Sequence, residues 1–133
     1  MAPATTLQRV ALVVGGAGFL LFGVYFLLNP SGLFQAVGVA GPTPQALLPE
    51  LRSFYGGLEI GLGLFILTGL VQATIARPAL WLMVCVYLGA ALGRALGIGI
   101  DGVVNSYMLI AGAVELAVAM LAFSALRLGQ FES

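Results

Sequence analysis

Four long apolar stretches, separated by short segments that contain polar, proline or glycine residues, make up most of the chain. Each stretch holds about 20 residues, the length that an α-helix needs to cross the apolar core of a bilayer. A helix also satisfies its own backbone hydrogen bonds, which lipid cannot do. We therefore predict an all-α fold, an integral membrane four-helix bundle that forms one domain over residues 1–133. The expected spans are residues 7–28, 50–71, 78–100 and 104–126.

The expected ends of these helices have local causes. Pro30 ends the first helix, because a residue that precedes proline avoids the helical region. Pro49 and Pro78 fall at the start of the second and third helices, where a first-turn proline is tolerated. An Asp-Gly pair at 101–102 is a turn signal that ends the third helix. Apolar residues in the 29–49 connection predict a short helix at the membrane interface. They are Leu33, Phe34, Val37 and Val39.

The positions of the arginines predict the orientation of the chain. Four spans place both termini on one side, and Arg9, Arg77 and Arg127 fall on that side. The opposite loops hold no basic residue apart from Arg52 at the start of the second helix. The positive-inside rule then places both termini in the cytoplasm and the 29–49 loop outside it. The apolar stretch after Arg9 is longer than the core of a signal peptide, so we expect it to be retained as a span.

Composition agrees with a membrane protein and excludes several other classes. Hydrophobic residues make up 61% of the chain and charged residues 8%, whereas a soluble domain carries about 25% charged residues. The arginines balance the acids, and no lysine or histidine is present. No basic patch is available for nucleic acid, and the usual haem and zinc ligand is missing. We expect no cofactor, no metal and no nucleic-acid partner. The single Cys85 cannot form an internal disulfide.

Small residues recur on the predicted helices at four-residue intervals. Helices in lipid associate by close packing, so small residues mark the faces that approach one another. We therefore predict that five glycines of the second and third helices form helix–helix contacts. They are Gly57, Gly61, Gly89, Gly93 and Gly97.

Charged residues lie within the predicted spans, where each costs at least about 2.5–3.5 kcal/mol on insertion scales. Glu59 and Glu115 lie in mid-span, roughly 13 and 16 Å from the outer ends of their helices at 1.5 Å per residue. Arg94 lies roughly 9 Å from the outer end of the third helix, and its long side chain can reach further. Arg52 and Asp101 lie near the outer boundary. Intramembrane charges are usually paired and functional.

The spacing of these residues predicts that they face one another. Arg52 and Glu59 are seven residues apart, almost two α-helical turns, and so share a face. Tyr87, Arg94 and Asp101 repeat this spacing on the third helix. We predict a polar, ligand-binding pocket in the outer half of the bundle, with Asn105, Ser106 and Tyr107 at its mouth. Its residues are Arg52, Tyr55, Glu59, Tyr87, Arg94, Asp101 and Glu115.

The predicted pocket contains more acids than arginines. If all of its charged groups gather, one carboxylate lacks a dedicated cation, and both desolvation and the like-charged neighbour disfavour its ionised form. We expect that Glu59 or Glu115 carries a proton at neutral pH, or that the two share one.

Residues 50–63, 77–79 and 93–97, together with Asp101 and Glu115, resemble a bacterial family of small four-span proteins, domain of unknown function 4345. The resemblance covers nearly the whole chain. More distantly, a glutamate in a glycine-rich second span is similar to the DoxX-like membrane proteins. The family resemblance supplies no activity. It implies a four-helix bundle, which we expect in the bacterial inner membrane, and it implies that six residues occupy the family's patterned polar positions. These are Arg52, Tyr55, Glu59, Arg94, Asp101 and Glu115.

Three classes of function remain open at this stage. In the first, the pocket binds or moves a small molecule, a lipid or quinone-like ligand, or a proton; the arginines hold anionic or carbonyl groups and the glutamates accept protons or hydrogen bonds. A monomer or a homo-oligomer is compatible with this first class. In the second, the protein is an accessory subunit of a larger membrane complex, and the charges serve helix packing or assembly. An enzyme is the least favoured class, because no nucleophile with an adjacent base, no metal-ligand spacing and no phosphate loop is visible.

Overall fold

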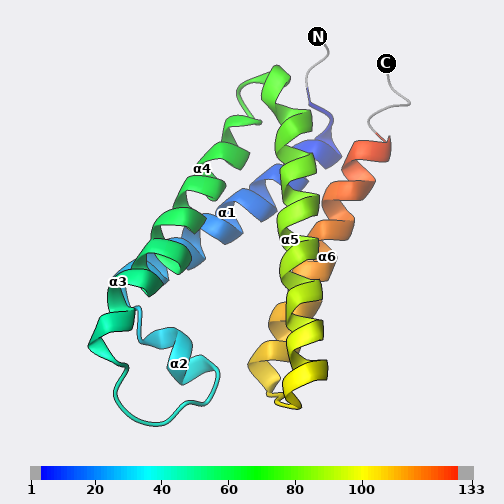
Figure 1. The fold of residues 1–133 in the computed structure, drawn as a ribbon. Helices are drawn as coiled ribbons and strands as arrows, with labels where there is room; N and C mark the ends of the chain where they lie inside the picture. Colours follow the sequence, from blue (N-terminus) through cyan, green and yellow to red (C-terminus); the bar gives the residue numbers. More distant parts are fainter. Residues whose placement is uncertain (1–3, 129–133) are drawn as a thin grey trace.

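The structure is a computed structural model that describes residues 4–128. Those residues are mostly helical and contain no strand, in line with the predicted all-α class. Figure 1 shows the order of the elements along the chain. They are α1 (Thr6–Leu28), α2 (Gly32–Ala36), the 3-10 helix η1 (Gln45–Leu47), α3 (Leu48–Leu51), the π-helix η2 (Arg52–Leu58), α4 (Glu59–Thr68), α5 (Ala73–Asp101) and α6 (Ser106–Leu128).

Three of these helices, α1, α5 and α6, are long and apolar enough to cross a membrane. They overlap the first, third and fourth predicted spans. The expected start of the third helix is wrong, because α5 begins at Ala73 and Pro78 lies inside it. A proline close to a helix start removes only one backbone hydrogen bond, so the apolar sequence continues the helix through it.

The ends of α1 follow from its flanking residues. Thr5 and Gln8 form a capping box, in which the Thr5 hydroxyl accepts a hydrogen bond from the Gln8 backbone N–H at 3.3 Å. The Gln8 side chain accepts one from the Thr5 backbone N–H at 3.0 Å. Two N–H groups that the helix itself cannot satisfy thereby gain partners. α1 ends at Leu28, directly before the Asn-Pro pair at 29–30, because proline disfavours helical geometry in the residue before it.

A fourth long segment is built from α3, η2 and α4, which follow one another without a break over residues 48–68. Pro49 lies in the first turn of α3, where its missing N–H has no helical partner to lose. η2 is a π-helix, and its i→i+5 hydrogen bonds put more residues into each turn than an α-helix has. This segment covers most of the second predicted span, with a changed hydrogen-bond pattern at its centre.

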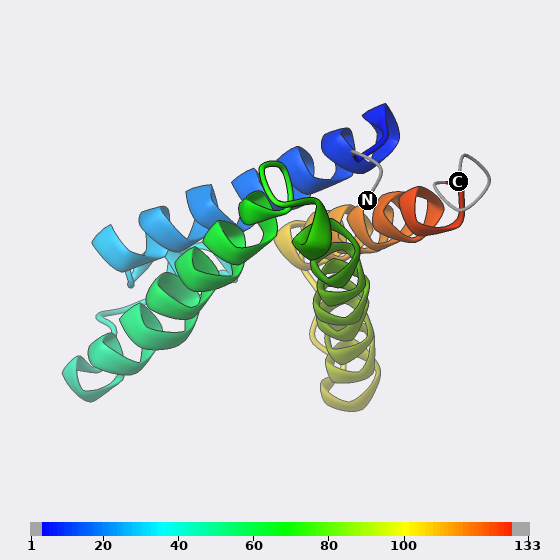
Figure 2. The ribbon, with the colours of Figure 1, turned by 90° about the horizontal axis from the view of Figure 1, so that it is seen from above.

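The long elements form two pairs that meet at one end and diverge at the other (Figure 1, Figure 2). α1 packs along η2 and α4, and α5 packs along α6. The buried core lies where the pairs meet and includes Leu12 of α1, Ile66 of α4 and Leu80 of α5. The Gln8 side-chain amide donates to the Ala125 carbonyl at 3.4 Å, so α1 begins where α6 ends. The lower ends of α4 and α5 in Figure 1 lie well apart.

Glycines make the close contact between α1 and α4. A Cβ atom added at Gly63 would lie 2.7 Å from the Gly16 carbonyl oxygen and 2.8 Å from the Leu20 nitrogen. One added at Gly23 would lie 2.8 Å from the Ile60 nitrogen. Larger residues at these positions would therefore push the two helices apart.

The predicted helix-packing glycines are a different set, and the structure corrects that prediction. A Cβ atom at Gly61, Gly89 or Gly93 would meet nothing within 4 Å. At Gly57 it would meet only the Arg52 carbonyl oxygen at 3.8 Å, and at Gly97 only an Asp101 carboxylate oxygen at 3.9 Å, both in the glycine's own segment. None of the five packs against another described helix, because the two pairs diverge where most of them lie.

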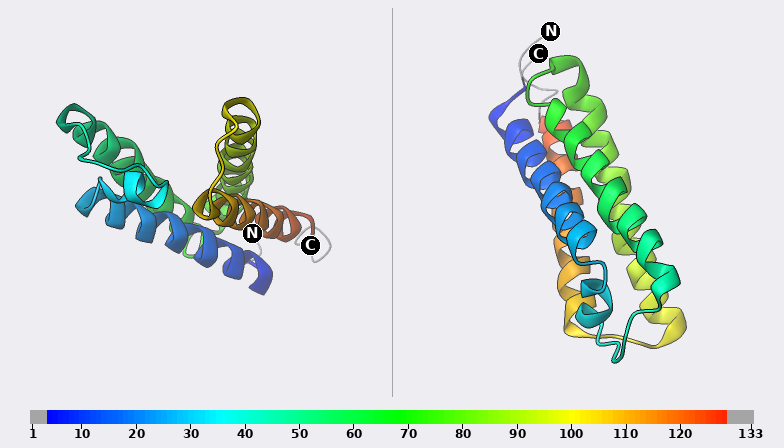
Figure 3. Two further views of the ribbon diagram at one scale, coloured as in Figure 1. Left: turned by 90° about the horizontal axis from the view of Figure 1, so that it is seen from below. Right: turned by 90° about the vertical axis from the view of Figure 1, so that its left-hand side faces the viewer.

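A hydrogen bond connects the loops at the open end. The Asn105 side-chain amide donates to the Val37 carbonyl at 2.8 Å, which ties the loop between α5 and α6 to the end of α2. The Asn105 side-chain oxygen also accepts from the Met108 backbone N–H at 2.9 Å and thereby caps α6. Figure 3 shows α2 beside the start of α6 at this end of the molecule. The predicted short helix in the 29–49 connection corresponds to α2.

Candidate functional site

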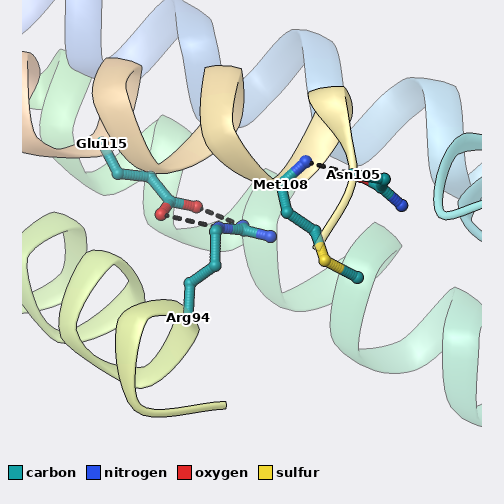
Figure 4. Close-up of polar contacts among 4 residues, drawn as sticks. All are labelled: Arg94, Asn105, Met108 and Glu115. Atoms are coloured by element: carbon teal, nitrogen blue, oxygen red, sulfur yellow. Dashed lines mark hydrogen bonds and ion pairs between the residues drawn. The ribbon is translucent and has the colours of Figure 1, made fainter. Parts of the chain in front are cut away.

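Arg94 on α5 and Glu115 on α6 form a two-point ion pair, which Figure 4 shows. Arg94 Nη2 lies 2.6 Å from Glu115 Oε1, and Arg94 Nε donates to Glu115 Oε2 at 3.2 Å. The two side chains are 25% and 15% exposed. This fork geometry is the stronger type of arginine–carboxylate contact. The predicted approach of charged groups from the third and fourth spans is confirmed for this pair.

The absence of a side chain at Gly112 leaves room for the Arg94 side chain to lie against α6. A Cβ atom at Gly112 would lie 3.3 Å from Arg94 Cδ, and Gly112 precedes Glu115 by three residues, close to one helical turn. On the far side, the Arg94 guanidinium lies 5.9 Å from the centre of the Tyr107 ring, within the range of a cation–π contact. Both neighbours hold the guanidinium over the carboxylate of Glu115.

Glu59 has the opposite surroundings. It is the first residue of α4 and is half-buried. Its Oε2 atom is fully buried and has no hydrogen-bond partner in the part of the chain that the structure describes. Buried polar atoms in folded proteins are nearly always hydrogen-bonded, so an exception calls for an explanation.

An open pocket of about 420 Å³ lies beside Glu59, between residues 47–62 and α5. Apart from Glu50, Tyr55 and Glu59, the side chains that line it are apolar. Its apolar members are Phe19, Leu47, Leu51, Phe54, Leu58, Leu62, Val86 and Ala90. Its volume falls within the range found for small-molecule sites.

Electrostatic interactions connect the groups around this pocket. The Glu59 carboxyl group lies within electrostatic range of Glu115. Tyr107 interacts with both glutamates, with Arg94 and with Tyr55. Ionisable groups from three of the four predicted spans therefore gather in one region, as their sequence spacing predicts.

Tyr87 braces the helices beside the pocket and does not line it. Its hydroxyl donates to the Gly15 carbonyl at 2.8 Å, and its ring packs against Phe19 with the ring centres 4.5 Å apart. The side chain is buried. The structure thus assigns Tyr87 to the contact between α5 and α1, and Phe19 covers it on the pocket side.

The structure places Arg52 and Asp101 outside the pocket, which corrects their predicted place in it. The Arg52 guanidinium donates to the Leu27 carbonyl, one of the carbonyls at the end of α1 that the helix leaves unsatisfied. Asp101 is the exposed last residue of α5, and its side chain makes no hydrogen bond or ion pair with the residues described. The wider turns of η2 separate the faces of Arg52 and Glu59 that α-helical spacing would align.

Sequence reasoning missed the apolar half of the site. Phe19, Val86 and Ala90 line the pocket, but each lies in a long apolar run that offers no signal to distinguish it. Gly112 could have been identified from the sequence, because it lies on the same face of its helix as Glu115. Within residues 4–128, no three acidic or cysteine side chains are close enough together to hold a metal ion.

These features define a class: a small helical protein with apolar helices of membrane-spanning length and a largely apolar pocket with two carboxyl groups in its wall. The chain belongs to the family described as Domain of unknown function (DUF4345), whose model matches residues 7–126. Comparison with curated proteins finds no match, and comparison with solved structures finds none either.

Proposed function

We propose that this protein spans a bacterial inner membrane four times and binds a small molecule in the pocket beside Glu59. The segment over residues 48–68 is the fourth span in this proposal, with α1, α5 and α6. It is apolar and continuous, and at 1.5 Å per residue it is roughly 30 Å long, the thickness of the apolar core of a bilayer.

The arginines support an orientation for these spans. Arg9, Arg77 and Arg127 lie at the start of α1, the start of α5 and the end of α6, which is the end where the helix pairs meet (Figure 1). By the positive-inside rule this end and both termini are cytoplasmic. The pocket then lies in the outer half of the membrane.

The observation that carries the binding function is the buried, unpartnered Oε2 atom of Glu59 beside a preformed pocket. Leaving a buried polar atom without a partner costs about 1–3 kcal/mol. Glu59 lines the pocket, so a ligand there would supply the missing partner once the carboxyl group rotates to turn this oxygen toward it. Three lining residues, Phe54, Tyr55 and Leu58, are 59%, 41% and 52% exposed, so the pocket opens on the side of the molecule that lipid would surround.

Native mass spectrometry of the detergent-extracted protein tests this function. Ala90→Phe places a ring in the pocket wall, and we expect it to displace a molecule that copurifies with the unmodified chain. Ala95→Phe is the matched control, because Ala95 is also exposed on α5 but does not line the pocket. The proposal is wrong if no molecule is retained, or if both variants retain it equally.

A second candidate, an accessory subunit of a larger membrane complex, is favoured by the open space beside Gly89 and Gly93 on α5. Small residues allow a helix of another protein to approach closely. In this case Gly93→Leu should shift the protein from a large to a small complex on native gels of extracted membranes. Ala90→Phe should leave the large complex intact.

A further inference from the structure

We propose that the ligand of this pocket is a single-chain amphiphile with a hydrogen-bond-donating head group, a hydroxyl or an amine, and not an anionic lipid. This inference rests on the proposed binding function and adds the chemical class of the ligand. It also reverses the expectation that arginines hold an anionic or carbonyl group.

Both arginines near the site already contact other groups of the protein, and both lie outside the pocket wall. Arg94 directs its Nε and Nη2 atoms to the two oxygens of Glu115, so the negative charge of that carboxylate offsets the positive charge of the guanidinium. Arg52 donates to the Leu27 carbonyl at the end of α1. Neither side chain lines the pocket.

The pocket wall is rich in hydrogen-bond acceptors. Its polar groups are the carboxyl groups of Glu50 and Glu59 and the hydroxyl of Tyr55, and Glu115 lies within electrostatic range of Glu59. A carboxyl group accepts hydrogen bonds whether or not it carries a proton. A hydroxyl can therefore donate to the carboxyl group of Glu59, which lines the pocket. An ammonium group favours the ionised form of that carboxyl group and adds a charge-assisted bond. A negatively charged head group would meet acidic groups with no cation to balance them.

The shape of the pocket fits one apolar chain. A volume of about 420 Å³ lies near the small end of the range for ligand pockets. Phe19 of α1 and Val86 of α5 close it on the protein side. The opening beside Phe54 and Leu58 lets the remainder of a longer tail extend among the surrounding lipid chains.

Three probes with the same tail, hexadecylamine, hexadecanol and palmitate, test the head-group class by native mass spectrometry at neutral pH. We expect the amine to bind the unmodified protein at least about tenfold more tightly than palmitate, a difference that one charge-assisted bond can supply. We expect the alcohol to bind between the two. Tighter binding of palmitate would overturn the inference.

Variants of Glu59 separate the two head groups. Glu59→Gln keeps an acceptor oxygen but no charge, so hexadecanol should still bind while the amine loses about tenfold in affinity. Glu59→Leu should weaken both. Asp101→Asn is the control, since it makes the same chemical change outside the pocket and should alter neither. An amine affinity that Glu59→Gln leaves unchanged would also contradict the inference.

The outcomes distinguish a failure of this inference from a failure of the proposed binding function. If palmitate binds best and Ala90→Phe abolishes its binding, the pocket binds a ligand but the head-group class is wrong. If none of the three probes binds and no molecule copurifies, the binding function itself fails. The comparison of the three probes on the unmodified chain does not depend on the folding of any variant.

Discussion

Glu59 and Glu115 are the same residue type in neighbouring parts of one site, yet their surroundings differ. Glu115 accepts two hydrogen bonds from Arg94, whereas the Oε2 atom of Glu59 accepts none in the described part of the chain. A charge inside a membrane is costly unless it is paired. Glu115 therefore has a structural reason to be where it is, and Glu59 has one only if another molecule contacts it.

This contrast predicts that Glu59 lowers the stability of the empty protein. Glu59→Leu removes the unpartnered oxygen and should raise the free energy of unfolding by about 1–3 kcal/mol. A rise in Tm of the ligand-free protein in detergent would be the measurement, with reduced ligand retention alongside it. Functional groups commonly cost stability in this way. A lower Tm for Glu59→Leu would mean that its carboxyl group has a stabilising contact after all.

Removing one partner of the Arg94–Glu115 ion pair should instead lower the stability of the protein. Glu115→Leu leaves Arg94 without its carboxylate and should cost about 1–3 kcal/mol, less than the roughly 3–5 kcal/mol of a fully buried pair. The side chains are 25% and 15% exposed, so the protein encloses this pair only in part. The double variant Arg94→Leu/Glu115→Leu should recover most of it, because no charge remains unpaired. Thermal unfolding of the single and double variants checks this order, and equal Tm values would contradict it.

At the scale of elements, the length of the apolar runs was enough to predict long helices, but not the π-helix within residues 48–68. The sequence of η2 fits an α-helix equally well, and the seven-residue spacing from Arg52 to Glu59 assumes α-helical turns. The i→i+5 bonds of η2 change that phase. Arg52 consequently reaches the end of α1 while Glu59 faces the pocket.

The glycines show a second limit of periodicity. Gly89 and Gly93 share one face of α5, as their spacing predicts, but nothing packs on that face within the described chain. Gly16 and Gly63, which lie outside the four-residue series, make the closest approach between α1 and α4. A repeat of small residues identifies a face, but it cannot say which helix, if any, covers it.

Two glycines of α4, one that contacts α1 and one that does not, allow a matched test of this helix contact. Gly63→Ala places a Cβ atom 2.7 Å from the Gly16 carbonyl oxygen, and backbone cannot yield as a side chain can. We expect a loss of about 1–3 kcal/mol in stability. Gly61→Ala meets nothing within 4 Å and should leave stability unchanged or raise it by up to about 1 kcal/mol, since alanine favours the helix. The two variants are compared by Tm in the same detergent, where similar values would argue against the contact.

At the scale of the whole molecule, the site depends on the way the two helix pairs diverge. The core that includes Leu12 and Leu80 holds them together at one end, and the Asn105–Val37 hydrogen bond joins their loops at the other. The pocket lies between residues 47–62 and α5, where the pairs separate. Sequence patterns predicted that Arg94 and Glu115 meet, but not that Arg52 and Asp101 lie outside the pocket. The pocket itself results from the angle between the pairs, which no local pattern encodes.

The same arrangement makes the membrane topology testable with three single cysteines in a Cys85→Ala background. Ala46, Ala73 and Ser106 are exposed, and they flank the 48–68 segment and α5. In intact spheroplasts, a membrane-impermeant maleimide should label Ala46→Cys and Ser106→Cys, and it should label Ala73→Cys only after permeabilisation. If Ala46→Cys and Ala73→Cys react from the same side, the segment interrupted by η2 does not cross the membrane, and Glu59 cannot lie at membrane depth. If all three sites react on the reverse sides, the four spans stand, but the pocket opens toward the cytoplasmic leaflet and must take its ligand from there.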